Sequence, residues 1–177
     1  MPFTCFAYGS NMFLLKMKKP APSAQFKIVG RLPGYVLRFN KESKDDGSGK
    51  GNIVATGNTT DEVWGVIYEI ADRDRKPLDH SEGGYDAIMV EILTATGRLS
   101  VLTYVAKPNR VSDSLKPYTW YKEFIVRGAK EHGLPAAYIQ ALETIEAMKD
   151  PDQPREQKNL DLLGATFAPN ALRRAPS

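Results

Sequence analysis

The sequence predicts an α+β protein in which many short strands form a barrel or sandwich and two helices pack on the sheet. Short runs rich in β-branched and aromatic residues recur over the first 105 positions, and beyond Val105 the apolar spacing changes from two to nearly four. The chain has 177 residues, which is enough for one substantial core but short for two. We therefore expect one domain with one site.

The strands are expected where these runs fall. An apolar run at residues 3–8 ends at Gly9, Ser10 and Asn11, which predicts a buried strand leading into a tight turn. Further runs lie at residues 26–32, 35–39, 53–56, 63–70, 86–93 and 98–105. The run at 63–70 is apolar at nearly every position, which predicts a central strand covered on both faces.

Residues 41–52 separate two of these runs. Their sequence, KESKDDGSGKGN, contains no apolar side chain and is rich in Gly and Asp. This composition predicts a mobile surface loop, which either closes over a site as a lid or only connects two strands.

Two helices are predicted after the strands. Apolar residues over 121–129 fall on one helical face, and Gly133 is expected to end this helix. Pro135 suits the first turn of a second helix, whose apolar spacing runs over residues 138–145. Prolines beyond residue 150 break any longer periodicity and leave a short helix near 158–163 with a loose tail.

The composition excludes several classes of protein. Lys and Arg number 24 against 21 Asp and Glu, without clusters of basic and stacking aromatic residues, so no nucleic-acid partner is expected. The single cysteine, Cys5, excludes an intramolecular disulfide and a multi-cysteine metal site, and favours a reducing, cytoplasmic compartment. No long apolar segment with charged flanks occurs, so neither a signal peptide nor a membrane partner is expected.

The turn Tyr8-Gly9-Ser10-Asn11 is the first candidate site. Successive N–H groups in such a turn can converge on a carboxylate or a developing oxyanion, and glycine permits positive φ there. If Gly9 has positive φ, Gly9→Ala is expected to damage binding and turnover together. The alternative is an ordinary connecting turn in which Asn11 bonds its own backbone.

Glu82 is the second candidate. It lies in the segment LDHSEGG at residues 78–84, which predicts a short helix that ends at two glycines. A carboxylate near a helix C-terminus is electrostatically unfavourable, which indicates a special role, with an ordinary solvated carboxylate as the alternative. His80 and Asp79 compete as proton carriers, but neighbours in a helical turn point to different faces, so at most one or two of these residues enter a pocket together.

Other chemistries lack the residues they need. A hydrolytic triad requires a histidine beside the nucleophile, and only His80 and His132 are present, with His132 expected to be exposed at a charged helix end. No phosphate loop, dinucleotide fingerprint or two-histidine metal spacing occurs, so neither a cofactor nor a metal is predicted. Cys5 lies inside the first strand without a basic partner and is expected to be an inert core thiol.

Two motifs together resemble the γ-glutamylcyclotransferase family: FAYGSNM at residues 6–12 and LDHSEG at residues 78–83. DEVWGV at residues 61–66 and GAKEHGLP at residues 128–135 are similar to further segments of that family, so the resemblance spans about residues 4–145.

The resemblance implies an organisation and a reaction. The fold would be a small mixed β-barrel with flanking helices, forming a catalytic domain over residues 1–150 that is followed by a C-terminal extension over residues 151–177. The reaction, which belongs to glutathione metabolism, would convert a γ-glutamyl amino acid to 5-oxoproline and the free amino acid without a metal or nucleotide. Both a monomer and a homodimer are compatible with the sequence.

The resemblance also implies roles for individual residues. The loop from Tyr8 to Asn11 would bind the small-molecule substrate, and Glu82 would be the general acid and base. Tyr121 would be a pocket tyrosine, with Tyr104 as a weaker candidate. For both tyrosines the alternative is core packing with a hydrogen-bonded hydroxyl.

One position departs from the family pattern. Many relatives carry a tyrosine several residues after the Glu-Gly pair, whereas here Tyr85 comes early and Met89 occupies the more usual place. The substrate is therefore open between γ-glutamyl amino acids, γ-glutamyl amines and other γ-glutamyl conjugates. A catalytically silent ligand-binding module of the same fold is a further alternative.

Overall fold

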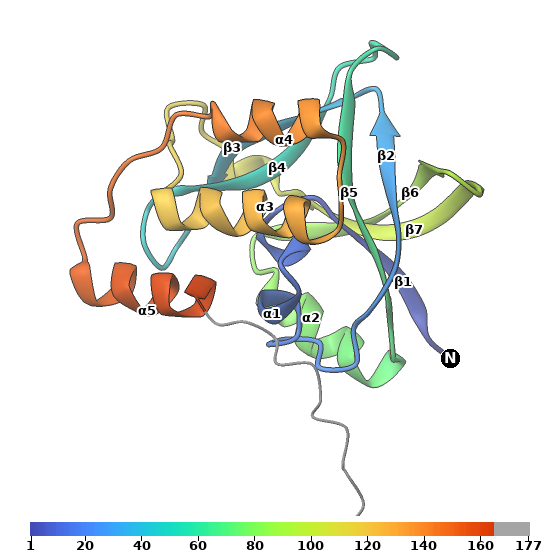
Figure 1. Ribbon diagram of the computed structural model, residues 1–177, viewed down its shortest axis with the longest axis horizontal. Helices are drawn as coiled ribbons and strands as arrows, with labels where there is room; N and C mark the ends of the chain where they lie inside the picture. Colours follow the sequence, from blue (N-terminus) through green and yellow to red (C-terminus); the bar gives the residue numbers. More distant parts are fainter. Residues whose placement is uncertain (165–177) are drawn as a thin grey trace, which may run out of the picture.

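The structure, a computed structural model, describes residues 1–164 (Figure 1). Part of the tail expected after the last helix falls on residues 165–177 and lies outside the described residues. Five strands close into a barrel in the order β1-β5-β2-β6-β7. Their bounds are β1 Phe3–Ala7, β2 Gln25–Pro33, β5 Glu62–Ile70, β6 Tyr85–Thr94 and β7 Gly97–Ala106.

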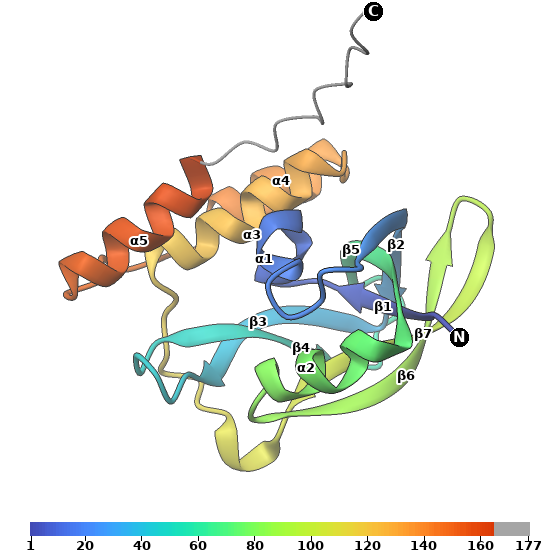
Figure 2. The same cartoon turned by 90° about the horizontal axis from the view of Figure 1, so that it is seen from below.

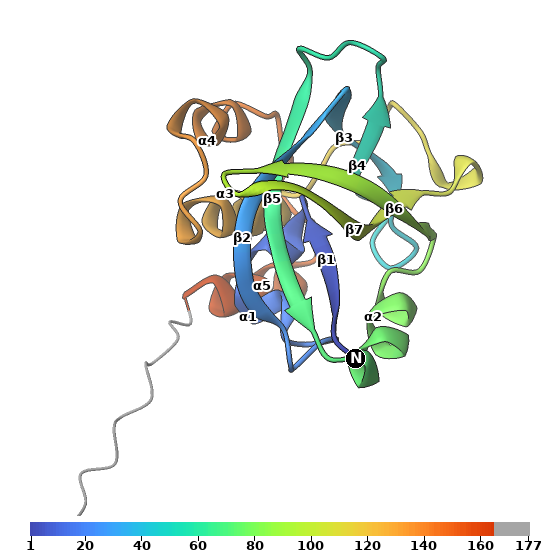
Figure 3. The ribbon, with the colours of Figure 1, turned by 90° about the vertical axis from the view of Figure 1, so that its right-hand side faces the viewer.

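The barrel is mixed, as predicted. Strand β1 pairs in parallel with β7 through Cys5 and Leu102, and this pairing closes the barrel. The remaining neighbours in the barrel are antiparallel, and β6 and β7 form the long hairpin that crosses the barrel in Figure 3. Closure leaves the barrel strands without an open edge, which removes unpaired backbone groups from the sheet.

Strand β5 is central and covered on both faces, which confirms the prediction. It pairs with β1 on one side and with β2 on the other. Since successive side chains point to opposite faces, Val63 and Ile67 enter one apolar cluster, whereas Val66 and Tyr68 enter the other. Each of these four side chains is fully buried.

Residues 41, 42 and 49–52 are strand and residues 43–48 connect them, so the prediction of a loop across 41–52 is wrong for half of the segment. Strands β3 (Tyr35–Glu42) and β4 (Gly49–Ala55) form an antiparallel hairpin whose polar residues pair with one another. The Nδ2 of Asn52 donates to Oδ1 of Asn40 at 3.0 Å, and Oδ1 of Asn52 accepts the N–H of Ala106 at 2.9 Å. Buried polar groups need such partners, so hydrogen bonds hold this segment where apolar side chains usually would.

The helices gather mainly on one side of the barrel (Figures 1 and 2). The α-helices are α1 Leu14–Met17, α2 Arg75–Ser81, α3 Thr119–Glu131, α4 Ala136–Glu143 and α5 Gln153–Gly164. The described residues also form three short 3-10 helices, η1 Ser10–Met12, η2 Asp72–Asp74 and η3 Pro108–Arg110. Within residues 1–164, no helix has the combination of length and apolar character needed to cross a membrane.

Helices α3 and α4 confirm the two predicted helices, and α5 starts earlier than the short helix predicted near 158–163. Pro154 falls in the first turn of α5, where the missing N–H costs little. Ahead of α5, the Nε1 of Trp120 on α3 donates to Oδ2 of Asp150 at 2.8 Å, and the Nε of Arg155 donates to the same oxygen at 2.7 Å. These bonds attach the start of α5 to α3.

His132 is enclosed, contrary to the expectation that it is exposed. Its side chain is 6% exposed and stacks on Phe26 of β2 with ring centroids 4.9 Å apart. Its Nε2 lies 3.0 Å from the hydroxyl of Tyr68, and burial lowers the pKa of the imidazole. The charged neighbours along the helix indicated exposure, but a side chain from a distant strand covers the ring.

Candidate active site

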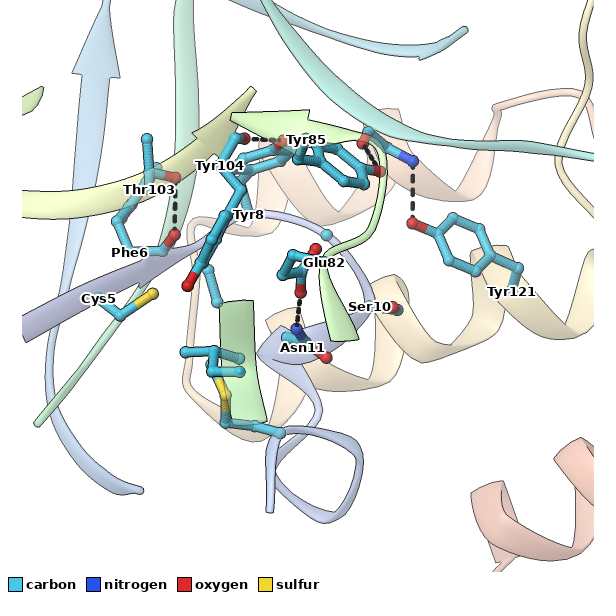
Figure 4. Close-up of a pocket in the computed structure, with 15 residues that line it drawn as sticks. Cys5, Phe6, Tyr8, Ser10, Asn11, Glu82, Tyr85, Thr103, Tyr104 and Tyr121 are labelled. Atoms are coloured by element: carbon cyan, nitrogen blue, oxygen red, sulfur yellow. Dashed lines mark hydrogen bonds between the residues drawn. The ribbon is translucent and has the colours of Figure 1, made fainter. Parts of the chain in front are cut away.

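A pocket lies where β1 ends, between η1, the end of α2 and α3 (Figure 4). Its volume is about 60 Å³. The structure brings all the predicted site residues to this one pocket: Tyr8, Gly9, Ser10, Asn11, Glu82, Tyr104 and Tyr121.

The turn at the end of β1 is built by η1. Gly9 precedes this helix and accepts the N–H of Met12 at 3.0 Å. The first residues of a helix have no acceptor for their N–H groups within the helix, so Ser10 and Asn11 have donors for a partner outside it, and those of Ser10 are shared with the nearby hydroxyl of Tyr121. This arrangement provides the backbone donors that an anion at the turn requires.

Gly9 does not have positive φ. Its backbone adopts φ −106° and ψ −146°, and a Cβ at this position would lie 3.6 Å from the hydroxyl oxygen of Tyr121, an ordinary contact distance. The condition behind the expected damage by Gly9→Ala is therefore not met. Positive φ occurs across the site instead, at Gly84 with φ 89°, where it lets the chain leave α2 and enter β6.

The position of η1 is fixed by contacts with three elements. The hydroxyl of Tyr68 on β5 donates to the carbonyl of Met12 at 2.7 Å. Helix α3 packs so closely that a Cβ at Gly128 would lie 2.5 Å from backbone atoms of Met12 and Phe13. On β7, the hydroxyl of Thr103 donates to the carbonyl of Phe6 at 2.9 Å and anchors the end of β1. The turn is therefore a rigid part of the site.

Glu82 forms the C-cap of α2 and faces the turn. Its N–H donates to the carbonyl of Leu78 at 3.1 Å, and its Oε1 accepts a hydrogen bond from Nδ2 of Asn11 at 2.7 Å. Burial raises the pKa of Glu82 to about 7, although the charge of Lys41 and the bond from Asn11 act in the opposite direction. Near neutral pH the carboxyl group therefore populates both protonation states.

His80 and Asp79, the two residues that compete with Glu82 as proton carriers, have different surroundings from Glu82. His80 is exposed to solvent, and Asp79 accepts the hydroxyl of Tyr104 at 2.6 Å and the Nε of Arg75 at 2.9 Å. Neither is among the described residues that line the pocket. Glu82 is thus the carboxyl group that points to the turn.

The predicted tyrosines line the pocket and also use their hydroxyls for structural bonds. Tyr8 donates to the carbonyl of Tyr104 at 2.6 Å, while Tyr104 donates to Asp79. The hydroxyl of Tyr121 accepts the N–H of Gly51 at 2.9 Å. For Tyr104 and Tyr121 the two alternatives were a pocket tyrosine and a core tyrosine with a hydrogen-bonded hydroxyl. Both descriptions apply, because each side chain is packed and hydrogen bonded and each also forms part of the pocket wall.

The prediction missed several residues that line the pocket, among them Tyr85 and Gly51. Tyr85 donates its hydroxyl to the carbonyl of Gly51 at 2.7 Å, whereas Met89 is 63% exposed. The position of Tyr85 directly after two glycines was a usable signal, because such a residue starts a strand beside the preceding helix end. Gly51 contributes only backbone atoms from a segment predicted to be a loop, so its sequence gave no signal.

Cys5 also lines the pocket, but its environment makes it unreactive. The side chain is 2% exposed, and burial raises the pKa of the thiol far above its usual range. A protonated thiol is a poor nucleophile. The structure thus confirms the expected inert thiol.

Tyr121→Phe is expected to lower the free energy of unfolding by about 1–3 kcal/mol, because the buried N–H of Gly51 loses its acceptor. The change also loosens the wall formed by Gly51 and Tyr85. Urea unfolding measures this effect, with Tyr35→Phe on β3 as the control. Equal stability of the wild type and Tyr121→Phe would show that another acceptor replaces the hydroxyl.

Comparisons with known proteins agree with this geometry. The AIG2-like family matches residues 62–142. Human and bovine γ-glutamylcyclotransferases are each 34% identical to this chain over 148 residues, covering 81% of this chain and 79% of each relative. A solved γ-glutamyl cyclotransferase structure matches with a TM-score of 0.82 and 30% identity, covering 93% of this chain and 99% of the other. The resemblance seen in the motifs is confirmed, and the chain belongs to the γ-glutamylcyclotransferase family.

Proposed function

We propose that this enzyme converts a γ-glutamyl amino acid to 5-oxoproline and the free amino acid, with Glu82 as general acid and base. The observation that carries the proposal is the enclosed Glu82 carboxyl group, which is bonded to Asn11 and faces the turn of η1. A carboxyl group with a pKa of about 7 can both accept and return a proton at neutral pH.

The reaction needs no nucleophile from the protein. The α-amine of the substrate attacks its own γ-carbonyl carbon, a new C–N bond closes a five-membered ring, and the bond to the departing amine breaks. This route agrees with the protonated state of Cys5. Holding the substrate folded supplies much of the rate, since effective molarities on the order of 10⁵ M or more are attainable in oriented intramolecular reactions.

Glu82 would transfer protons in both halves of the reaction. In its ionised form it takes a proton from the α-ammonium group, which frees the nitrogen lone pair for attack. The same carboxyl group then gives this proton to the departing nitrogen, and the ring nitrogen loses its second proton to the released amine, so the ring closes as a neutral amide and the amine leaves as an ammonium ion. Asn11 holds the carboxylate at Oε1, which leaves Oε2 for the proton transfer.

The turn would stabilise negative charge on the substrate. Amides at Ser10 and Asn11 are suited to the γ-carbonyl oxygen as it becomes an oxyanion, or to the α-carboxylate. Removing one donor of this kind typically costs about 2.7–4 kcal/mol in the transition state. Tyr8, Tyr104 and Tyr121 would form the wall that keeps the substrate folded.

The catalytic unit is assigned to residues 1–150, with residues 151–177 as an extension. This assignment rests on the pocket, whose described lining residues lie between Cys5 and Tyr121. A cytoplasmic setting agrees with the single reduced cysteine.

The proposal is tested with a panel of γ-glutamyl substrates that includes dipeptides, γ-glutamyl amines and other conjugates. Chromatography detects 5-oxoproline, and the expected result is product from at least the dipeptides. The absence of 5-oxoproline across the whole panel would contradict the proposal and favour a silent ligand-binding module.

Asn11→Leu is expected to move the acidic limb of the kcat/KM profile to higher pH by about one unit. The amide of Asn11 favours the ionised form of Glu82, so its removal raises the pKa of Glu82 above the wild-type value of about 7. The measurement is kcat/KM between pH 5 and 9, with Asn159→Leu on α5 as the control. If the acidic limb stays at its wild-type pH in Asn11→Leu, the ionisation that it reports belongs to a group other than Glu82.

A further inference from the structure

A second cavity adjoins the pocket along the segment that carries Glu82. We call it the basic groove; its charged lining residues are Lys41, Lys44, Asp45, Lys107 and Arg110. Its volume is about 630 Å³, against about 60 Å³ for the pocket. Glu82 and Tyr85 line the pocket, whereas Gly83 and Gly84 between them line the groove, so one short segment forms a wall of both cavities.

Lys41 is a buried cation without a counter-ion. The residue is 8% exposed, and its Nζ lies 4.8 Å from the ring centroid of Tyr85. No carboxylate among residues 1–164 lies within ion-pair distance of this ammonium group, although its charge acts on Glu82 across the shared wall. A buried charge is costly unless it is paired, which points to an anionic group that arrives with a ligand.

Arg110 brings a second cation to the same place. A Cβ at Gly84 would lie 3.1 Å from Cε of Lys41 and 3.5 Å from Cγ of Arg110, so both side chains flank Gly84. A β-bridge between Lys41 and Val111 fixes the two segments side by side. Arg110 also has no ion pair in the described part of the chain, whereas Lys107 is paired with Asp86 at 3.7 Å.

The groove is relevant to the reaction because it begins beside the place where the departing amine is released. Glu82 protonates that amine, and the chain reaches Gly84 two residues later, where Lys41 and Arg110 begin the groove. Lys41 lies over the ring of Tyr85, which lines the pocket. A substituent of the leaving amine that passes Glu82 and Tyr85 would therefore meet Lys41 first and then Arg110 and Lys44 of the groove.

On the basis of the proposed function, we propose that the basic groove selects γ-glutamyl compounds whose leaving amine carries two negative charges, such as an acidic amino acid. Lys41 would bind the carboxylate nearest the reacting bond, and Arg110 with Lys44 would bind the second. Arg110 is thus a specificity-determining residue, whereas Lys41 would hold the carboxylate that acidic and neutral leaving amino acids share. If the side chain of the leaving amino acid were neutral, Arg110 and Lys44 would have no anionic partner.

The test compares γ-glutamyl-glutamate with γ-glutamyl-glutamine, which match in size and shape and differ by one negative charge. We expect the wild type to favour the acidic dipeptide by about tenfold in kcat/KM, the effect of one charge-assisted hydrogen bond. The preference is expected to weaken as the salt concentration rises, because dissolved ions screen the charges of Arg110 and Lys44, which are at least partly exposed.

Two variants locate the preference in the groove. Lys41→Met keeps the aliphatic stem that packs beside Tyr85, and Arg110→Gln keeps a polar side chain of similar reach. Arg110→Gln is expected to reduce the ratio of the two kcat/KM values toward one, whereas Lys41→Met is expected to lower both values to a similar extent, because Lys41 binds the carboxylate that both dipeptides carry. Lys158→Met, an exposed substitution on α5, is the matched control and is expected to leave the ratio at its wild-type value.

Calorimetric binding of the same two dipeptides separates the groove from the proposed function. If 5-oxoproline forms but the ratio is near one, or Arg110→Gln keeps the wild-type ratio, the groove assignment is wrong and the reaction stands. If no product forms but the wild type still binds the acidic dipeptide more tightly, and Arg110→Gln does not, the groove assignment stands and the reaction is wrong. Absence of both product and preferential binding contradicts both.

Discussion

Glu82→Gln is expected to lower turnover by roughly 10²- to 10⁴-fold while leaving substrate binding in place. The amide keeps the size of the carboxyl group and can still bond Asn11, but it cannot take a proton from the α-ammonium group or return one to the departing amine. Steady-state release of 5-oxoproline measures the loss. Turnover near the wild-type value would remove Glu82 from the mechanism.

The same variant carries its own test of folding. The pKa of Glu82 in the folded protein, about 7, lies above the ordinary value of 4.5. The contribution of this group to stability is therefore fully present below about pH 4.5 and is lost as pH rises through about 7. Above pH 7, Glu82→Gln is expected to be at least as stable as the wild type in urea unfolding. Glu123→Gln on α3 serves as the control, because it changes a carboxyl group outside the pocket.

Gly128→Ala is expected to destabilise the fold and weaken substrate binding together. Alanine is favoured over glycine in a helix interior by about 0.8–1.0 kcal/mol, so propensity alone would stabilise α3. The added Cβ, however, would lie 2.5 Å from backbone atoms of Met12 and Phe13, which forces α3 and η1 apart. Overpacking of this kind typically costs about 1–3 kcal/mol, so the net effect is a loss of stability.

Binding is affected because η1 carries the turn that holds the substrate. We expect a higher KM and lower kcat/KM for Gly128→Ala, accompanied by a lower urea midpoint, whereas Glu123→Ala on the same helix is expected to leave KM unchanged. A variant that gains stability and keeps its KM would show that the contact between α3 and η1 does not position the turn.

The parts of the fold that were predicted correctly are those with a local signal. The continuous apolar run of β5 indicated a strand buried on both faces, and the helical spacing near Tyr121 indicated α3. Residues 41–52 were misread because buried polar side chains look like a loop in sequence. Their partners, such as the N–H of Ala106 for Asn52, lie far along the chain.

The candidate site shows the same limit. The motifs around Tyr8 and Glu82 identified both halves of the pocket, but the bond that joins them, from Asn11 to Glu82, spans 71 positions and has no local signature. Tyr85 and Gly51 were missed for a related reason, since their bond connects β6 to the hairpin of β3 and β4. Long-range contacts of this kind arise where η1, the end of α2 and the hairpin of β3 and β4 pack around the barrel.

The most direct test of the account is a carbon-13 NMR titration of the Glu82 side-chain carboxyl group, with and without 5-oxoproline. The signal is identified by its absence in Glu82→Gln. If the enclosed carboxyl group and the glycine turn share one cavity as described, it titrates near pH 7, and the product shifts the titration. A midpoint near pH 4.5 that does not respond to 5-oxoproline would contradict the account.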